Sequence, residues 1–392
     1  MSSDIKNICD FCGSHQMRAV YKVPDSQLHS VICLCQKCGL VQSNQTSKEK
    51  NRQVSISCDA DWGNIRHGKG IRLKPALDVL NRHIQWDSIT SVLDVGSNRG
   101  KFITWIDQNH PQIQVTAVEP DSRIINDYPT TINPIVDRFE NVDIELETQD
   151  LIMNCHTLEH SDSAFIMIQK MKNILKPNGW LYVDVPNLQV IEDPFQIEQF
   201  FIDKHTFHFH RSVLRNYLEC QSFQVKFEND PSDRYNIILL CQKSKNHHQE
   251  YKRMEKGEIR QIEQLIRDYK KRLIHNRKQL KTISSTLHKF MHRQITAIWG
   301  SGKILDALIK YGGLKLSDSA ILIDEYLYGI ISEVHGIQLN SSSVLRNTKV
   351  DAVVILARSA TKEIIEKIKR FGIYNIITYE DLWSGITRYD DA

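Results

Sequence analysis

Short apolar runs alternate with amphipathic segments through the middle of the chain. Apolar runs, typical of buried strands, occupy Ser91–Val95, Val115–Val118, Asp150–His156 and Trp180–Val185. Between them, the segment that begins at Lys101 and the one that runs through Met171 to Leu175 have the spacing of helices. Strands that alternate with helices predict an α/β fold with a parallel, doubly wound sheet.

A second set of apolar runs near the C-terminus predicts a smaller Rossmann-like domain. Its expected strands cover 295–299, 320–324, 351–356 and 374–378, with a helix over 361–371. Gly300 and Gly302 follow the first of these strands, but Leu305 replaces the third glycine of a dinucleotide-binding fingerprint, which favours a remnant fold without a second cofactor. The polar stretch before it has apolar residues at helical spacing and predicts one or two amphipathic helices with a charged, solvated face.

These patterns divide the chain into four parts. We expect an N-terminal domain over 1–58, a central domain over 59–244, a helical linker over 245–294 and a C-terminal domain over 295–392.

The composition is that of a globular protein, with 41% hydrophobic and 25% charged residues. The formal net charge of +3 is nearly balanced, so we expect no nucleic-acid partner. No run of about 18 apolar residues and no signal-peptide pattern occur, so we expect no membrane partner and a cytoplasmic protein. The sequence does not indicate an oligomeric state.

Two Cys-x-x-Cys pairs near the N-terminus predict a zinc site. Cys9 and Cys12 form the first pair, and Cys35 and Cys38 form the second. Four thiolates in two such pairs suit one tetrahedral Zn²⁺ ion and leave no open position for a substrate, so the predicted role of the metal is structural.

The end of the first central strand predicts a cofactor turn. Gly96 and Gly100 allow a sharp turn and a close approach of the backbone to a ligand. Glu119 follows the next strand, where a carboxylate can accept hydrogen bonds from both hydroxyls of a ribose. Asn154 and Pro186 end the following strands, so we expect these residues to share one crevice at the carboxyl edge of the sheet.

This order of residues resembles the class I methyltransferases, and within them the zinc-ribbon sugar C-methyltransferases. The likeness rests on the two cysteine pairs, Gly96-Ser97-Asn98-x-Gly100, Val118-Glu119-Pro120, Leu158-Glu159-His160 and Val185-Pro186-Asn187. The resemblance implies transfer of a methyl group from S-adenosylmethionine to a sugar that is linked to a nucleotide, in polysaccharide or natural-product biosynthesis. It also implies that the C-terminal domain helps to hold the nucleotide-sugar.

The resemblance also assigns cofactor residues. It implies cofactor contacts at Asp94, Gly96 and Gly100, a ribose contact at Glu119, and a place near the adenine for Asp137 or Phe139. Ser97, Pro120 and Asn154 complete the predicted cofactor set.

A histidine-rich segment near residue 205 supplies the candidate base. A histidine can take the proton that the acceptor loses when it attacks the methyl group, and we predict His205 for this role. His156, His160 and His208 are candidate substrate contacts, although His208 alternates with phenylalanines and also fits the polar face of an edge strand.

The sequence does not decide which atom of the acceptor is methylated. The resembling family carries tyrosine, histidine and glutamate where this chain has Ile202, Asp203 and Lys204, and its glycine-rich sugar-binding stretch is replaced by 230–236. Methylation of oxygen or nitrogen, for example on an aminosugar, is therefore an alternative to carbon. An inactive zinc-containing scaffold is a further alternative.

Overall fold

The computed structural model describes residues 8–24, 26–44, 72–122, 125–244, 250–316 and 320–385. The predicted domain boundary after Cys58 and the start of the predicted linker at Lys245 lie outside these ranges. The chain forms two compact units. Among the described residues, the first unit contains 8–24, 26–44, 72–122, 125–193, 200–244 and 250–269, and the second contains 194–199, 270–316 and 320–385.

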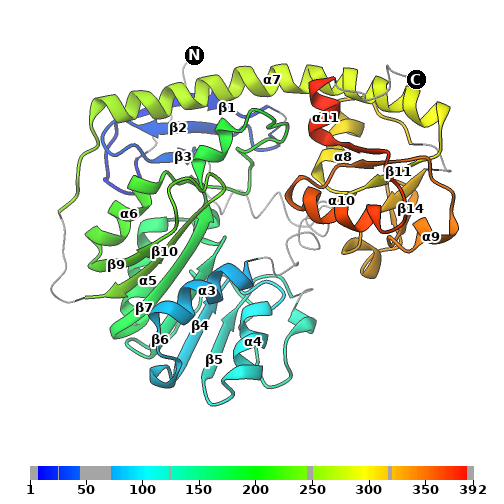
Figure 1. Cartoon of the computed structure of the whole chain (residues 1–392). Coiled ribbons are helices and arrows are strands. Elements are labelled where there is room, and N and C mark those ends of the chain that lie inside the picture. The colour runs from blue at the N-terminus through cyan, green and yellow to red at the C-terminus, as the bar shows by residue number, and fades with distance from the viewer. Residues whose placement is uncertain are drawn as a thin grey trace. The chain divides into compact units, whose positions relative to one another are not determined.

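A six-stranded sheet forms the centre of the first unit (Figure 1). Its strands are β4 (Ser91–Val95), β5 (Gln114–Val118), β6 (Gln149–Cys155), β7 (Leu175–Pro186), β9 (Phe223–Glu228) and β10 (Asn236–Lys243), in the order β5-β4-β6-β7-β10-β9. The strands β5, β4, β6 and β7 pair in parallel, whereas β10 is antiparallel to both of its neighbours. The sheet is therefore mixed rather than wholly parallel as predicted, because the chain returns from β9 to β10 through a short turn.

Helices cover both faces of this sheet. Apolar residues of α3 (Leu73–His83) and α4 (Lys101–Asn109) pack against one face, and those of α5 (Ala164–Ile174) and α6 (Arg211–Cys220) pack against the other. Neighbouring strand residues alternate between the faces: Val92 contributes to the first core and Leu93 to the second. A sheet buried on both sides explains why its strands read as continuous apolar runs.

A small antiparallel sheet combines three N-terminal strands with one strand from the middle of the chain. It contains β1 (Met17–Lys22), β2 (Val31–Cys35), β3 (Val41–Ser43) and β8 (Phe207–His208), in that order. Strand β8 comes from the histidine-rich segment and pairs with β3, so that His208 lies opposite Val41. The candidate catalytic segment is thereby attached to the N-terminal sheet.

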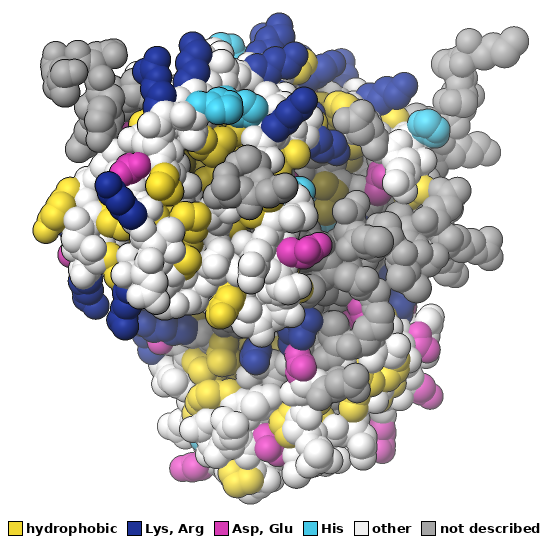
Figure 2. All heavy atoms as spheres, turned by 90° about the vertical axis from the view of Figure 1, so that its right-hand side faces the viewer, with side chains coloured by type: hydrophobic (Ala, Val, Ile, Leu, Met, Phe, Trp, Pro, Cys, Tyr) yellow, Lys and Arg dark blue, Asp and Glu magenta, His cyan; other side chains and the backbone are white. Residues whose placement is uncertain are grey.

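One long helix, α7 (Lys256–Arg293), begins in the first unit and continues in the second. Its buried residues include Ile259, Ile262, Ile266, Tyr269, Leu273, Leu280, Ile283 and Leu287, which alternate mostly three and four positions apart and form one face. Lysine and arginine side chains gather along the upper edge of the face drawn in Figure 2. Most basic residues of α7 are exposed, as expected for a solvated face.

The second unit contains another six-stranded sheet, in the order β13-β14-β12-β11-β15-β16. All its pairings are parallel except β13 with β14. The strands are β11 (Thr296–Trp299), β12 (Ile321–Ile323), β13 (Glu333–Val334), β14 (Ile337–Asn340), β15 (Ala352–Ile355) and β16 (Ile376–Thr378). The helices are α8 (Lys303–Lys310), α9 (Val344–Asn347), α10 (Thr361–Lys369) and α11 (Tyr379–Ser384). The sequence predicts four of these strands and misses the hairpin of β13 and β14.

Short 3₁₀ helices complete the described fold. They are η1 (Trp86–Ser88), η2 (Ile125–Asp127), η3 (Leu158–His160), η4 (Leu188–Glu192), η5 (Leu327–Gly329) and η6 (Arg358–Ala360). Within the described ranges, none of the helices has the length and apolar character that a membrane span requires.

Candidate functional site

The turn after β4 forms the centre of the candidate site. Gly96, Asn98 and Gly100 have φ angles of 73°, 48° and 66°, which is the left-handed region that glycine adopts readily. A Cβ atom at Gly96 would lie 2.1 Å from Oγ1 of Thr157, the residue that precedes η3. Glycine is therefore required at position 96 for space as well as for conformation.

Glu119 ties this turn to the end of β5. The carboxylate of Glu119 accepts hydrogen bonds from the backbone N–H of Asn98 at 2.8 Å and from that of Asp121 at 2.9 Å. Burial of this side chain raises its pKa, while these two hydrogen bonds act to lower it. Glu119 is 6% exposed and lies at the place where a ribose-binding acid is predicted.

A second buried acid precedes the glycine turn by two residues. Asp94, in β4, is 5% exposed. Burial, together with the charge of Glu119, raises the pKa of Asp94 to about 7. Two buried carboxyl groups whose charges repel each other favour a bound cation.

Tyr128 supports the turn and is not among the residues predicted from sequence. Its hydroxyl donates to the backbone carbonyl of Asn98 at 2.6 Å and is hydrogen-bonded to Oγ of Ser97 at 2.7 Å. Ser97 is thus buried within the turn. Because Tyr128 and Ser97 are 31 residues apart in the sequence, no local pattern predicts the contact between them.

The remaining predicted cofactor residues lie around the same edge. Residue Ile135 extends β5 through an isolated bridge with Val118, and the exposed Asp137 follows two residues later. Phe139 is buried, with Nζ of Lys170 4.8 Å from its ring centre. Pro120 is exposed, whereas Asn154 is fully buried and its amide lies 3.8 Å from the sulfur of Met171.

His156 is held in a polar cluster at the ends of β6 and β7. Its Nδ1 lies 3.1 Å from Nη2 of Arg72, and its Nε2 lies 3.1 Å from Oδ1 of Asn236. The Asp184 carboxylate lies 3.4 Å from Nε2 of His156. Sequence reasoning found His156 but missed these three partners, which come from distant segments.

His160 and His205 meet at the same edge. Their ring centres are 4.7 Å apart in an edge-to-face arrangement, and Nδ1 of His160 lies 3.0 Å from the carbonyl oxygen of Lys204. The backbone N–H of Thr206 donates to the carbonyl of Glu159 at 2.8 Å. His208 is 2% exposed and packs against Phe201, in keeping with a strand residue.

Asp203 fastens the segment that carries His205. Its carboxylate accepts hydrogen bonds from the hydroxyls of Ser26 at 2.5 Å and Ser30 at 2.6 Å, and from the N–H of Gln27 at 3.0 Å. Burial acts to raise the pKa of Asp203, but the hydrogen bonds outweigh it and the pKa is lowered. The side chain that departs from the resembling family thus serves as an anchor.

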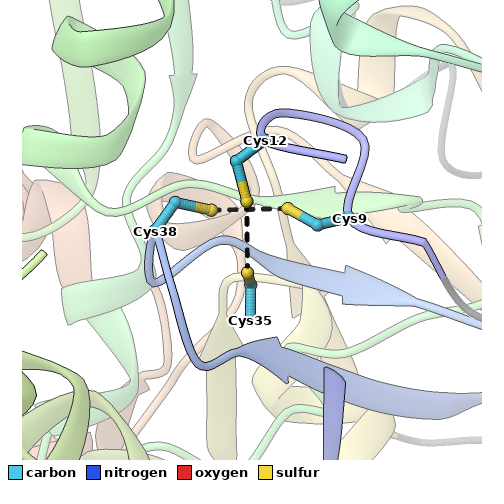
Figure 3. A group of neighbouring side chains, drawn as sticks. All are labelled: Cys9, Cys12, Cys35 and Cys38. Carbon is cyan, nitrogen blue, oxygen red and sulfur yellow. Dashed lines mark hydrogen bonds between the residues drawn. The ribbon is translucent and has the colours of Figure 1, made fainter. Parts of the chain in front are cut away.

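The four predicted cysteine ligands converge (Figure 3). Their sulfurs all lie within 4.8 Å of one another, with 3.3 Å between Cys9 and Cys38 and 3.6 Å between Cys12 and Cys35. None of them forms a disulfide. The pKa of Cys12 is lowered because the other three thiols act as its hydrogen-bond partners.

The cysteine cluster is part of the main core. The ring of Phe11 stacks on Tyr217 of α6 with centres 4.0 Å apart. The carboxylate of Asp10 accepts hydrogen bonds from the hydroxyl of Tyr217 and from the N–H of Phe165, both at 3.0 Å. The cluster therefore joins the N-terminal sheet to α5 and α6.

Comparison with known proteins identifies the central part of the chain. Residues 65–240 match the family described as "Methyltransferase domain". The chain contains a class I methyltransferase domain. It is an enzyme that depends on S-adenosylmethionine, and the glycine turn and Glu119 described above lie within the matched segment.

Solved structures with low sequence identity resemble this methyltransferase domain. A putative S-adenosylmethionine-dependent methyltransferase from Listeria monocytogenes is 12% identical, with a TM-score of 0.37 over 43% of this chain and 98% of that chain. The 1,6-didemethyltoxoflavin-N1-methyltransferase from Burkholderia thailandensis is 14% identical, with a TM-score of 0.39 over 57% of this chain and 98% of that chain. A search of the curated proteins finds no match.

Proposed function

We propose that this methyltransferase acts on a sugar, linked to a nucleotide, and that His205 is its general base. The observation that carries the proposal is the position of His205, whose ring packs against His160 at the end of η3. Thr157, just before η3, donates a hydrogen bond from Oγ1 to the carbonyl of Val95 and fills the space beside Gly96. The candidate base therefore packs against the η3 segment, and the residue just before η3 contacts the glycine turn.

The chemistry that this arrangement supports is an in-line displacement. An oxygen of the acceptor attacks the methyl carbon of S-adenosylmethionine, the new C–O bond forms, and the C–S bond breaks to release S-adenosylhomocysteine. His205 takes the proton that the acceptor hydroxyl loses. Because the sulfonium is already a good leaving group, orientation of the two reactants supplies most of the rate enhancement.

The chemistry of Asp203 favours oxygen as the acceptor atom. Removal of a proton from carbon requires additional groups that stabilise the resulting negative charge. The Asp203 carboxylate, which replaces one such group of the resembling family, is occupied by its hydrogen bonds to Ser26 and Ser30. Methylation of nitrogen, as on an aminosugar, would follow the same mechanism with a different acceptor atom. Analysis of the product distinguishes N-methylation from O-methylation.

We further propose that Cys9, Cys12, Cys35 and Cys38 bind a structural Zn²⁺ ion. A tetrahedral site with Zn–S bonds of about 2.3 Å separates its sulfurs by about 3.8 Å. The sulfur contacts of 3.3 and 3.6 Å are close to this spacing, so the donor set fits the ion without a large rearrangement. Four thiolates would fill the coordination shell, so the ion would stabilise the fold and leave the chemistry to other residues.

The cofactor site is tested by calorimetric titration with S-adenosylmethionine. We expect binding by the wild type and a weaker affinity for Glu119→Gln, because hydrogen bonds to a charged group contribute about 1.5–3 kcal/mol, or roughly ten- to hundredfold. Glu145→Gln, at an exposed site, is the control and should bind normally. Equal affinities for all three proteins would refute the predicted role of Glu119.

The acceptor class is tested by release of S-adenosylhomocysteine with a panel of nucleotide-linked sugars, free sugars and aminosugars. We expect turnover with a nucleotide-linked sugar, and a loss of about 10²–10⁴-fold in kcat for His205→Asn with little change in cofactor affinity. Nuclear magnetic resonance of the product identifies the methylated atom. Turnover only with acceptors that contain no sugar would overturn the proposed substrate class.

A further inference from the structure

Glu159, His160 and His205 form a second group of potential metal ligands, here called the Glu159 cluster. One donor atom from each residue lies within 4.8 Å of the other two. Within the described ranges, only the cysteine cluster forms another such group. Two imidazoles and one carboxylate are the donors that Zn²⁺, Co²⁺, Ni²⁺ and related ions prefer, whereas Mg²⁺ and Ca²⁺ prefer oxygen alone.

Glu159 contributes a buried carboxylate to this cluster. The residue is 1% exposed, and neither of its side-chain oxygens has a hydrogen-bond partner among the described residues. In the part of the chain that the structure describes, two histidine nitrogens lie near one of these oxygens, Nδ1 of His156 at 3.5 Å and Nε2 of His160 at 3.8 Å. A buried charge is costly unless a cation or several hydrogen bonds compensate it, so this carboxylate calls for a positive partner.

His156 is not that partner. The guanidinium of Arg72 is always protonated and donates to Nδ1 of His156, so this nitrogen is an acceptor. The hydrogen on the ring is therefore on Nε2, which faces Asn236 and Asp184. The Nδ1 atom that faces Glu159 presents a lone pair and cannot donate to the carboxylate.

The hydrogen bond of the His160 ring leaves one nitrogen available as a metal ligand. Its Nδ1–H donates to the carbonyl of Lys204 at 3.0 Å, which leaves the lone pair on Nε2, the nitrogen that faces Glu159. A backbone carbonyl that fixes the tautomer in this way is the usual outer support of a metal-bound histidine. The side chain of His160 is 39% exposed, so an ion can reach the cluster from solvent.

We propose that the Glu159 cluster binds a divalent transition-metal ion, and that this ion inhibits the methyltransferase by occupying the lone pair of His205. The three protein ligands leave coordination positions for water, so the ion exchanges with solvent, unlike an ion that four cysteines enclose. The inhibition rests on the proposed function of His205 as the base. The binding of the ion does not depend on it.

Binding is tested on the full chain, purified with the cysteine cluster filled by Zn²⁺ and titrated with Co²⁺. We expect one additional Co²⁺ per chain, with visible d–d absorption but without the charge-transfer band that thiolate ligands produce. Glu159→Gln and His160→Gln should each weaken this binding by about tenfold or more. His83→Gln, on α3 outside the cluster, is the matched control and should bind normally. No additional site, or one unchanged in both variants, overturns the proposal.

Inhibition is tested by the release of S-adenosylhomocysteine at increasing Zn²⁺ concentration, with a limiting amount of chelator to reverse the effect. We expect kcat to fall in proportion to occupancy of the additional site, while affinity for S-adenosylmethionine is unchanged. Full activity at saturating occupancy would overturn the inhibitory role. If no acceptor is turned over at all, the proposed acceptor class fails, and the Co²⁺ titration still decides whether the site exists.

Discussion

At the residue scale, two buried acids lie at the proposed cofactor site. Asp94 and Glu119 are both nearly inaccessible, and burial raises the pKa of each. A carboxyl group in such surroundings ionises most readily when a cation binds beside it. The protonation of Asp94 should therefore be linked both to folding and to binding of the cofactor.

Replacement of Asp94 by asparagine tests this linkage. The pKa of Asp94 is about 7 in the folded protein, against an ordinary value of 3.8, so between about pH 4 and 7 the folded state holds a proton that the unfolded state has lost. Stability should fall as pH rises through this window, by up to about 1.4 kcal/mol per unit from this group, and level off above pH 7. Asp94→Asn should lack this slope in the free energy of unfolding, measured by urea titration.

The ionisation of Asp94 should also make cofactor affinity depend on pH, in the direction opposite to that of stability. Affinity of the wild type for S-adenosylmethionine should increase as pH rises through 7, because Asp94 then ionises, whereas Asp94→Asn should bind weakly without this dependence. Asp78→Asn, at an exposed position of α3, serves as the control. If the pH profiles of Asp94→Asn and the wild type coincide, Asp94 is not the titrating group.

At the element scale, the segment before β8 depends on contacts that are remote in sequence. Strand β8 pairs with β3, and Asp203 accepts hydrogen bonds from Ser26 and Ser30 of the loop between β1 and β2. These contacts fix the backbone on either side of His205. A base must stay within hydrogen-bond reach of the proton that it removes, so the anchor is expected to affect turnover.

Asp203→Asn should weaken this anchor. An amide oxygen can replace only one of the two carboxylate acceptors, so we expect a loss of about 1–2 kcal/mol in stability and a several-fold fall in kcat at neutral pH. The pKa of Asp203 is lowered, so its contribution is present above its unfolded value of 3.8 and is lost as pH falls through the folded value. The difference in unfolding free energy should therefore be constant near neutrality and shrink below about pH 4.

Lys204→Ala is the control for this experiment, because that side chain is exposed and only its backbone carbonyl contacts His160. Thermal unfolding and steady-state kinetics measure the two effects. Should Asp203→Asn behave like Lys204→Ala in both, the carboxylate does not position the base.

The elements with local signals could be predicted from the sequence. Four strands of the central sheet lie where continuous apolar runs predict them, and the glycine turn follows the first. Strand β9 has a local signal that our prediction overlooked, since Phe223, Val225 and Phe227 alternate with polar residues. Strand β8 could not be predicted, because its two residues are a strand only through their pairing with β3.

The candidate site was predictable to a similar extent. Cysteine spacing alone indicates the cysteine cluster, and the glycine turn with the next strand-end acid indicates the cofactor site. The partners of these residues could not be predicted, because Tyr128, Arg72 and Asn236 reach the site only through the folding of distant segments. The anchoring role of Asp203 also requires the fold, since its serine partners lie more than 170 residues earlier.

At the scale of the whole molecule, the cysteine cluster belongs to the core of the first unit rather than to a separate module. Cys9, Cys35 and Cys38 are buried in the same apolar cluster as Val95 of β4 and residues of α5 and α6. Loss of a metal from the four cysteines should therefore not unfold the N-terminal sheet alone. It should destabilise the methyltransferase domain with it.

Cys35→Ser, or removal of zinc by a chelator under reducing conditions, tests this coupling. Metal binding by four thiolates contributes on the order of 10 kcal/mol in zinc-finger peptides, which is comparable to the whole net stability of a typical domain, about 5–15 kcal/mol. We expect about one zinc per wild-type chain by elemental analysis, and a large fall in the unfolding temperature when it is lost.

Loss of the zinc should also accelerate hydrogen exchange in α6, because Tyr217 loses its contacts with Asp10 and Phe11. Cys33→Ala, two residues away in the same strand but outside the cluster, should retain the zinc, and its unfolding temperature should fall much less than that of Cys35→Ser. If zinc-free protein instead keeps slow exchange in α6 and loses it only in β1 to β3, the N-terminal sheet folds as an independent module.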